Sequence, residues 1–194
     1  MRTLRSSLSK LSRLAALSAL LMAAAHAQAA GCPTLLDRQA LRLQDEKPQN
    51  LCQYAGRVVV VVNTASFCGF TSQYKALEAL HARFAARGLV VLGFPSNDFG
   101  AQEPGSNAEI AAFCENTFGV KFPMFVKSHV VAKAGGELNP LFAELGKRTG
   151  KTPTWNFHKY VIARDGQTVQ SFGTTTSPDE PAFVEALEKL LNAK

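Results

Sequence analysis

Cys68 is the residue of this chain whose position most directly suggests chemistry. It lies in the segment Asn-Thr-Ala-Ser-Phe-Cys-Gly-Phe-Thr at residues 63–71, after five valines at residues 58–62 and before a helical pattern. Unpaired backbone N–H groups and the positive end of the helix dipole favour negative charge at the start of a helix. A cysteine in this position can ionise and act as a nucleophile. The alternative is a small apolar residue that fills the end of a strand.

Three further side chains carry groups that suit chemistry at such a sulfur. Gln102 lies in a loop rich in Gly and Pro, and Trp155 and Asn156 come just before a later apolar segment. Amide and indole N–H groups are uncharged donors, which stabilise a thiolate and the charge that develops on a departing oxygen. Each also has an ordinary interpretation, because a lone tryptophan is usually core and a loop glutamine is usually solvated.

The spacing of apolar residues predicts the elements that must position these groups. A run of valines is typical of a strand buried on both faces, as in a parallel sheet. Strands that alternate with helices predict a parallel pair with a right-handed crossover, and Asp165-Gly166 predicts a hairpin that adds antiparallel strands. The expected fold class is α/β, with a thioredoxin-like fold in which helices flank a mixed central β-sheet. The predicted strands are residues 58–62, 89–94, 158–163 and 168–172, with a short extended piece at residues 123–126. The predicted helices are residues 74–87, with Gly88 as C-cap, residues 107–118, closed by Gly119, and residues 140–147 and 181–191.

This arrangement should bring the candidate residues to one edge of the sheet. Ligands of such sheets bind beyond the carboxyl ends of the parallel strands. Cys68 and Gln102 each follow one of these strands, and Trp155 and Asn156 precede a strand that runs the opposite way. Thr71 takes the place of the second cysteine of a Cys-x-x-Cys motif, so a dithiol site at this turn is excluded.

Residues 41–191 resemble the glutathione peroxidase family. The segment at residues 63–71 looks like the family's reactive-cysteine motif, and Gly-Phe-Pro-Ser-Asn-Asp-Phe-Gly-Ala-Gln-Glu-Pro-Gly at residues 93–105 is similar to its second signature. Trp-Asn-Phe at residues 155–157 is similar to its third. The resemblance implies a thiol peroxidase that reduces hydrogen peroxide and organic hydroperoxides through a sulfenic acid, without metal or cofactor. The catalytic set that it implies is Cys68 as nucleophile, with Gln102, Trp155 and Asn156.

The resemblance also implies how the enzyme is recycled. In thioredoxin-dependent relatives, a cysteine matching Cys114 resolves the oxidised intermediate, and a thioredoxin-like protein or glutathione is the expected reductant. The alternative for Cys114 is a buried thiol on a helix face. Ser96 and Asp98 depart from the residues that many relatives carry, but neither belongs to the catalytic set. Residues 133–155 lack the loop through which tetrameric relatives assemble, which implies a monomer.

The N-terminus reads as an export signal. The first half of residues 1–29 contains four basic residues and no acid, and a short apolar run and small-x-small cleavage sites follow. We therefore expect cleavage of this segment and a single domain over residues 30–194. The predicted location is the periplasm or outside the cell, without stable membrane insertion. Gly31-Cys32 only weakly suggests a lipoprotein. In an oxidising compartment, a structural disulfide between Cys32 and Cys52 is favoured over two free thiols.

Charge does not point to a nucleic-acid partner. The chain has 21 Lys and Arg against 15 Asp and Glu. Four of the basic residues precede residue 31, which leaves 17 against 15, a net charge of +2. The remaining basic residues are scattered. Two other functions stay open: a periplasmic redox sensor, in which oxidation of Cys68 signals, and a thiol–disulfide exchange protein.

Overall fold

Two parallel strands form the centre of the structure, which is a computed structural model that describes residues 31–132 and 136–193. β3 (Val58–Thr64) pairs in parallel with β4 (Leu89–Pro95), and every residue of both strands is buried. Such burial is expected for strands covered on both faces, and it explains their uninterrupted runs of β-branched and other apolar residues. The predicted export signal, residues 1–29, lies outside the described residues.

Two antiparallel strands complete the sheet. β5 (Lys159–Ile162) pairs with β3, and β6 (Val169–Phe172) pairs with β5, so the strand order is β4-β3-β5-β6. The predicted hairpin turn is present: the Asp165 carboxylate accepts the backbone N–H groups of Gln167 and Thr168, and Gly166 has a φ of 64°. This mixed sheet with helices on both faces is the thioredoxin-like fold that the sequence predicts.

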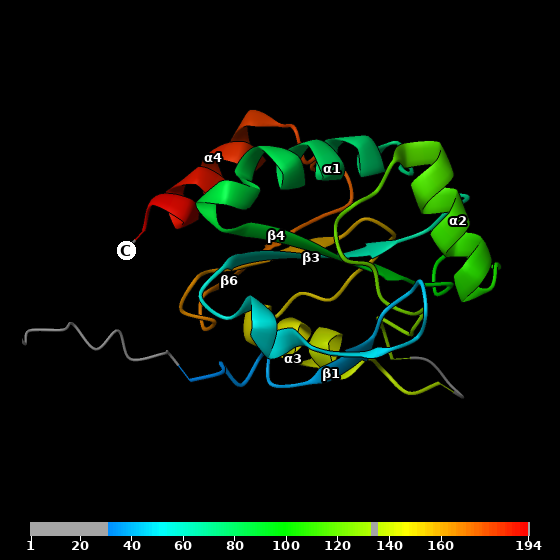
Figure 1. Cartoon of the computed structure of the whole chain (residues 1–194), viewed down its shortest axis with the longest axis horizontal. Coiled ribbons are helices and arrows are strands. Elements are labelled where there is room, and N and C mark those ends of the chain that lie inside the picture. The colour runs from blue at the N-terminus through cyan, green and yellow to red at the C-terminus, as the bar shows by residue number, and fades with distance from the viewer. Residues whose placement is uncertain (1–30, 133–135, 194) are drawn as a thin grey trace, which may run out of the picture.

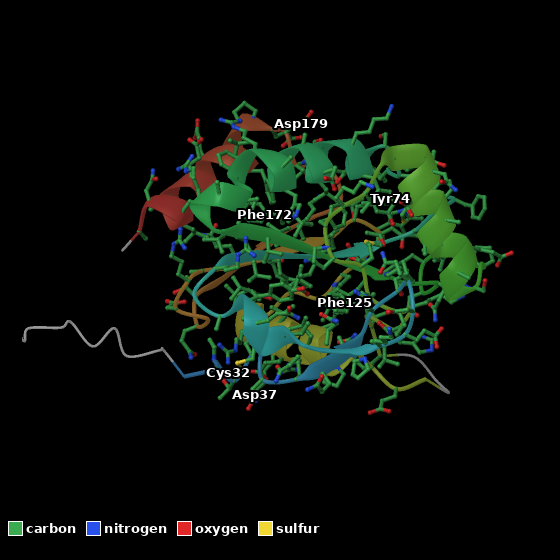
Figure 2. All side chains as sticks on the ribbon, viewed as in Figure 1. Cys32, Asp37, Tyr74, Phe125, Phe172 and Asp179 are labelled. Carbon is green, nitrogen blue, oxygen red and sulfur yellow. A yellow bond between two sulfur atoms is a disulfide. The ribbon has the colours of Figure 1, made fainter. Side chains whose placement is uncertain are left out.

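The helices form a layer on each face of the sheet (Figure 1). α1 (Gln73–Phe84) and α4 (Pro181–Asn192) cover one face, and α3 (Pro140–Thr149) covers the other with the N-terminal segment. Successive valines of β3 point alternately into the two layers, as the period of a strand requires. Figure 2 shows side chains filling both layers, with Tyr74 in one and Phe125 in the other.

α2 (Asn107–Phe118) lies at one end of the sheet and packs on the core with one side of the helix. Ser106 and Glu109 form a reciprocal capping box at its start, and Gly119 ends it in the left-handed conformation, with a φ of 64°. Only Ile110 and Cys114 of α2 are fully buried, whereas α1 buries five side chains. α2 is therefore the less firmly packed of the two helices.

The N-terminal segment contains elements that the apolar spacing does not predict. β1 (Gln39–Leu41) and β2 (Pro48–Asn50) form a two-stranded antiparallel sheet, followed by a 3-10 helix, η1 (Leu51–Tyr54). A second 3-10 turn, η2 (Ala85–Arg87), extends α1 to Gly88, the predicted C-cap. Residues 123–126, a predicted extended piece, lie alongside β4 through a parallel bridge between Gly93 and Met124.

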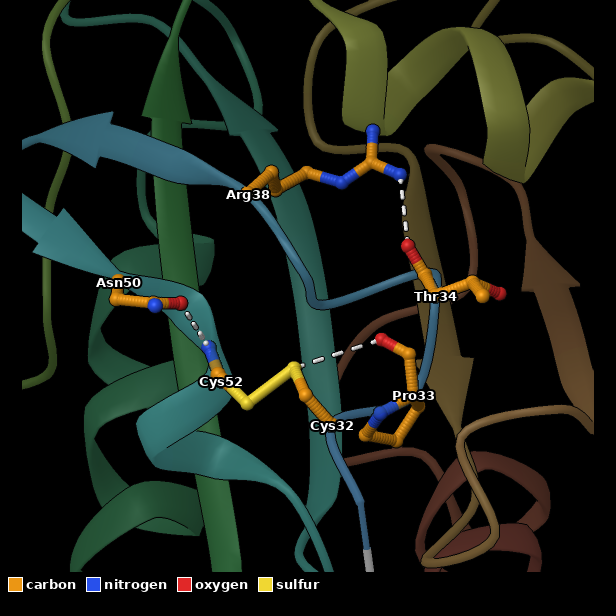
Figure 3. The surroundings of a disulfide bond; sticks show 6 residues. All are labelled: Cys32, Pro33, Thr34, Arg38, Asn50 and Cys52. Carbon is orange, nitrogen blue, oxygen red and sulfur yellow. Dashed lines mark hydrogen bonds between the residues drawn. A yellow bond between two sulfur atoms is a disulfide. The ribbon is translucent and has the colours of Figure 1, made fainter.

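A disulfide fastens the start of the described chain to η1. It joins Cys32 and Cys52, the pair that the sequence predicts, across a separation of 20 residues (Figure 3). Asn50 caps η1 by accepting the Cys52 backbone N–H at 2.9 Å, which fixes one side of the bridge. Within residues 31–132 and 136–193, no helix is both long and apolar enough to cross a membrane.

We expect Cys32→Ser to lower the free energy of unfolding by about 3 kcal/mol, because the bridge restricts the unfolded chain. Urea denaturation followed by circular dichroism measures the change. Wild-type protein treated with a reductant serves as the control, since it should lose the same stability while the variant loses none. Equal midpoints for all the samples would show that the bridge contributes nothing to stability.

Candidate active site at the Cys68 turn

Thr71 builds the turn that carries Cys68. Its side-chain hydroxyl donates to the Ala65 carbonyl at 2.9 Å and accepts the Cys68 backbone N–H at 3.0 Å. The Thr71 backbone N–H in turn donates to the Cys68 carbonyl at 3.0 Å. The side chain that replaces a second cysteine is thus a structural tie, buried within the turn. Three hydrogen bonds hold the backbone at Cys68 in one position before α1 begins.

The Cys68 sulfur is a free thiol at the boundary between core and solvent. It is partly buried, and its apolar side packs on the cluster that includes Tyr74 and Phe157. The Phe70 backbone N–H donates to the sulfur at 3.4 Å. A backbone donor aimed at sulfur stabilises negative charge there. The neighbouring Phe67 side chain is 67% exposed, so the outer side of the turn is open to solvent.

Asn63 attaches the segment at residues 155–158 to the end of β3. Its side-chain amide donates to the Trp155 carbonyl at 3.1 Å, and its side-chain oxygen accepts the His158 backbone N–H at 3.1 Å. Its own carbonyl accepts the Phe157 backbone N–H at 2.7 Å. Asn63 is fully buried, so all of its polar groups need partners within the protein. These hydrogen bonds hold residues 155–158 at the end of β3, next to the start of the Cys68 turn.

Gln102 and Asn156 are in direct contact. The buried Asn156 side chain donates to the Gln102 side-chain oxygen at 2.9 Å, and the Gln102 carbonyl accepts the backbone N–H of Phe67, next to Cys68, at 3.0 Å. The Thr174 hydroxyl donates to the Asn156 carbonyl at 2.8 Å. The structure therefore brings together two of the predicted catalytic amides and ties one of them to the cysteine turn.

Trp155 lies at the surface beside this pair. It is 37% exposed, and its ring packs against Phe99 with centroids 5.9 Å apart. Trp155 and Phe70 line the same shallow pocket, together with residues 173–175. Because Phe70 is two residues from Cys68, this shared pocket places the indole on the same side of the molecule as the cysteine turn. Trp155 is not a core residue, which was the alternative for a lone tryptophan.

Lys159 is a buried cation beneath the site, and no motif in the sequence marks it as part of that site. Its ammonium donates to the side-chain oxygen of Gln73 at 3.0 Å and to the carbonyls of Thr174 and Thr176 at 3.4 and 2.6 Å. Burial lowers the pKa of Lys159 to about 7, although the negative charge of Glu180 acts to raise it. These contacts connect the first turn of α1 to the loop that supports Asn156.

Cys114 lies on α2 and faces the core, with 2% of its surface exposed. Burial raises the pKa of its thiol to about 11, which the neighbouring Tyr74 hydroxyl partly offsets and the charge of Glu103 increases. Cys68 packs against the same apolar cluster, but both cysteines are free thiols. In this conformation Cys114 is therefore a protonated thiol covered by its own helix.

Ser96 and Asp98, the two departures from the family pattern, serve the loop after β4 rather than the sulfur. Asp98 contacts the His129 ring at 2.6 Å and accepts the Val130 backbone N–H at 2.7 Å. The Ser96 hydroxyl accepts the Asp98 backbone N–H at 3.3 Å. Nowhere in the part of the chain that the structure describes do three His, Cys, Asp or Glu side chains cluster as metal ligands would.

The chain is similar to glutathione peroxidases in sequence and structure. The glutathione peroxidase family profile matches residues 36–145. The chain is 44% identical over 160 residues to a hydroperoxy fatty acid reductase of Synechocystis sp., covering 76% of this chain and 90% of that protein. It is 43% identical over 140 residues to a glutathione peroxidase-like peroxiredoxin of Schizosaccharomyces pombe, covering 70% and 87%. The crystal structure of Trgpx in apo form superposes with a TM-score of 0.65 at 31% identity, covering 82% and 95%.

We expect Thr71→Val to slow the reaction of Cys68 with hydrogen peroxide about tenfold, because the turn loses the two hydrogen bonds of the hydroxyl that orient the sulfur. The unfolding free energy should fall by about 1–3 kcal/mol, since buried groups lose their partners. Stopped-flow oxidation and urea denaturation measure the two effects. Thr71→Ser, which keeps the hydroxyl, is the control and should stay near wild type. If Val and Ser variants react equally fast, the hydroxyl does not position Cys68.

Proposed function

The chain belongs to the glutathione peroxidase family and is an oxidoreductase acting on peroxides, and we propose that Cys68 is the residue that attacks the peroxide. The observation that carries the proposal is the position of this thiol: it is partly exposed and accepts a backbone N–H on its sulfur. Its turn is bonded through the Phe67 backbone N–H to the carbonyl of Gln102, whose side chain is bonded to Asn156. The substrates are hydrogen peroxide and organic hydroperoxides.

In the first step, the Cys68 thiolate attacks one oxygen of the peroxide. The S–O bond forms as the O–O bond breaks, the sulfur is oxidised to a sulfenic acid, and the other oxygen takes up a proton and leaves as water or an alcohol. The amides of Gln102 and Asn156 and the indole of Trp155 are uncharged donors that stabilise charge on the departing oxygen. No metal or organic cofactor takes part.

In the second step, the Cys114 thiol condenses with the sulfenic acid. The products are a Cys68–Cys114 disulfide and one water, so no external oxidant or reductant is consumed. Sulfurs must come within about 2 Å to bond, so α2 must partly open to present the buried Cys114. Its packing supports this, because only two side chains of α2 are fully buried.

A dithiol protein of the thioredoxin type then reduces the disulfide by exchange, with glutathione as the alternative reductant. Thiol–disulfide exchange on protein substrates is less well supported as the primary function. The residue in the position of a second cysteine is Thr71, whose hydroxyl is committed to the turn.

The enzyme acts as a monomer outside the cytoplasm, in the periplasm or secreted. The composition of residues 1–29 supports export, and the Cys32–Cys52 disulfide suits an oxidising compartment. The domain then spans residues 30–194.

Replacing the two free cysteines tests the mechanism. Cys68→Ser should lose peroxide turnover by ~10³-fold or more, because no nucleophile remains. Cys114→Ser should still consume about one equivalent of peroxide, but its thioredoxin-linked turnover should fall at least ~tenfold, because the sulfenic acid is not resolved. Coupled NADPH oxidation with thioredoxin and its reductase measures turnover.

Cys52→Ser is the matched control for these variants, since it removes a cysteine on the opposite face of the sheet and should keep its turnover. Undiminished turnover in Cys68→Ser would end the proposed function. Full thioredoxin-linked activity in Cys114→Ser would remove only the resolving role.

Export is tested by the mass of protein purified from an exporting bacterial host. We expect a mature chain that begins near residue 30, found in the periplasmic fraction, because the apolar run is followed by small residues that suit cleavage. A chain in which the Arg2, Arg5 and Lys10 side chains are replaced by glutamate is the control and should stay in the cytoplasm at full length. Full-length, cytoplasmic wild-type protein would contradict export.

A further inference from the structure

Glu103 is a buried carboxylate next to a predicted catalytic residue, and the mechanism above does not use it. It follows Gln102, and its side chain is 0% exposed. It lines a pocket of about 360 Å³ between the cysteine turn at residues 66–67 and α2, whose Ile110 and Phe113 form the opposite wall. Movement of α2 away from this wall would uncover the carboxylate.

The surroundings of Glu103 compensate its charge poorly. The hydroxyl and backbone N–H of Ser66 are the polar groups that favour the ionised form, but neither makes a hydrogen bond of ordinary geometry with the carboxylate. Lys127 is the nearby cation, and its ammonium is bonded to backbone carbonyls, at 3.2 Å to Glu103 and 2.6 Å to Gly105. Ionisation of Glu103 in this pocket therefore costs free energy, because the buried charge has no close partner.

The other titratable groups that face Glu103 come from α1 and α2. Burial raises the pKa of Tyr74 well above its usual value and that of Cys114 to about 11, and the charge of Glu103 adds to both shifts. Glu109 lies in the same pocket wall, but its bonds to Ser106 lower its pKa. Burial, opposed by Ser66 and Lys127, raises the pKa of Glu103 to about 7. Of these four acids, only Glu103 changes charge near neutral pH.

We propose that Glu103 is a positioning residue that controls the release of α2, and with it the delivery of Cys114 to oxidised Cys68. This inference rests on the proposed resolving role of Cys114. An ionised Glu103 is better accommodated by water than by the pocket wall, so its ionisation favours the open position of α2. A protonated Glu103 keeps α2 closed.

The direction of the pH effect follows from proton linkage. In the closed state Glu103 holds its proton up to about pH 7, whereas in the open state it has the ordinary pKa of 4.5. The closed state therefore binds more protons between these values, and opening is favoured as the pH rises through this window. The opening equilibrium should increase roughly thirty-fold from pH 5.5 to pH 8, and then level off.

The test measures the exposure of Cys114 without peroxide. In a Cys68→Ser chain, Cys114 is the one free thiol among the four cysteines. Its rate of modification by methyl methanethiosulfonate, relative to that of a short cysteine peptide at the same pH, gives its protection. We expect protection to fall roughly thirty-fold between pH 5.5 and pH 8. Glu103→Gln in the same chain should hold protection constant within about threefold.

Glu115→Gln is the matched control, because it removes the same charge from an exposed position on α2. It should keep the pH dependence of the parent chain. The proposal is overturned if protection in the parent does not change with pH, or if Glu103→Gln keeps the same change. If Glu103→Gln does not fold, as judged by circular dichroism, the parent profile alone decides.

A second measurement connects α2 release to turnover. After one equivalent of hydrogen peroxide, the rate of Cys68–Cys114 disulfide formation should rise with pH more steeply in the otherwise wild-type chain than in Glu103→Gln. If the two chains form the disulfide at equal rates at pH 5.5 and at pH 8, Glu103 does not control the step in which Cys114 resolves oxidised Cys68. If no such disulfide forms in either chain, the resolving role of Cys114 fails, while the protection profile still decides whether Glu103 controls α2.

Discussion

The geometry of the site depends most on a single buried amide, that of Asn63. This residue follows the valine run of β3, at the point where the strand meets the edge of the sheet. Each of its polar groups is paired with the segment at residues 155–158. Leaving such a group unpaired in the core costs about 1–3 kcal/mol. The segment that carries Trp155 and Asn156 is therefore held against the strand from which the Cys68 turn departs, although some 90 residues separate the two in sequence.

The framework of the fold follows from strong local patterns. The valine run predicts β3, because only a strand covered on both faces buries so many consecutive apolar residues. Gly88 and Gly119 both adopt the left-handed conformation at the helix ends where they were expected, and Asp165 shapes the predicted hairpin. The convergence of the Gln102 loop and the segment at residues 155–156 on one edge follows from strand direction alone. The direct bond between Gln102 and Asn156 agrees with that expectation.

What the sequence does not reveal depends on contacts between distant segments. β1 and β2 are three residues long and rich in polar side chains, so neither periodicity nor propensity distinguishes them from loops. Gln-Glu-Pro-Gly at residues 102–105 has the composition of a solvated turn, yet Glu103 is buried because α2 folds over it. Lys159 reads as a surface residue at the start of a strand and is covered by the loop at residues 174–176. Asn63 within β3 is the residue whose sequence position could have indicated such a contact, because an amide buried in a strand must find hydrogen-bond partners elsewhere in the chain.

The position of Trp155 has a practical consequence. It is the single tryptophan of the chain, and its ring is in contact with both solvent and Phe99 on the side of the molecule that carries the cysteine turn. Indole emission responds to the polarity and the quenching groups around the ring. The tryptophan fluorescence of this protein therefore comes from Trp155 alone, and stopped-flow fluorescence can follow changes around this ring without an attached dye.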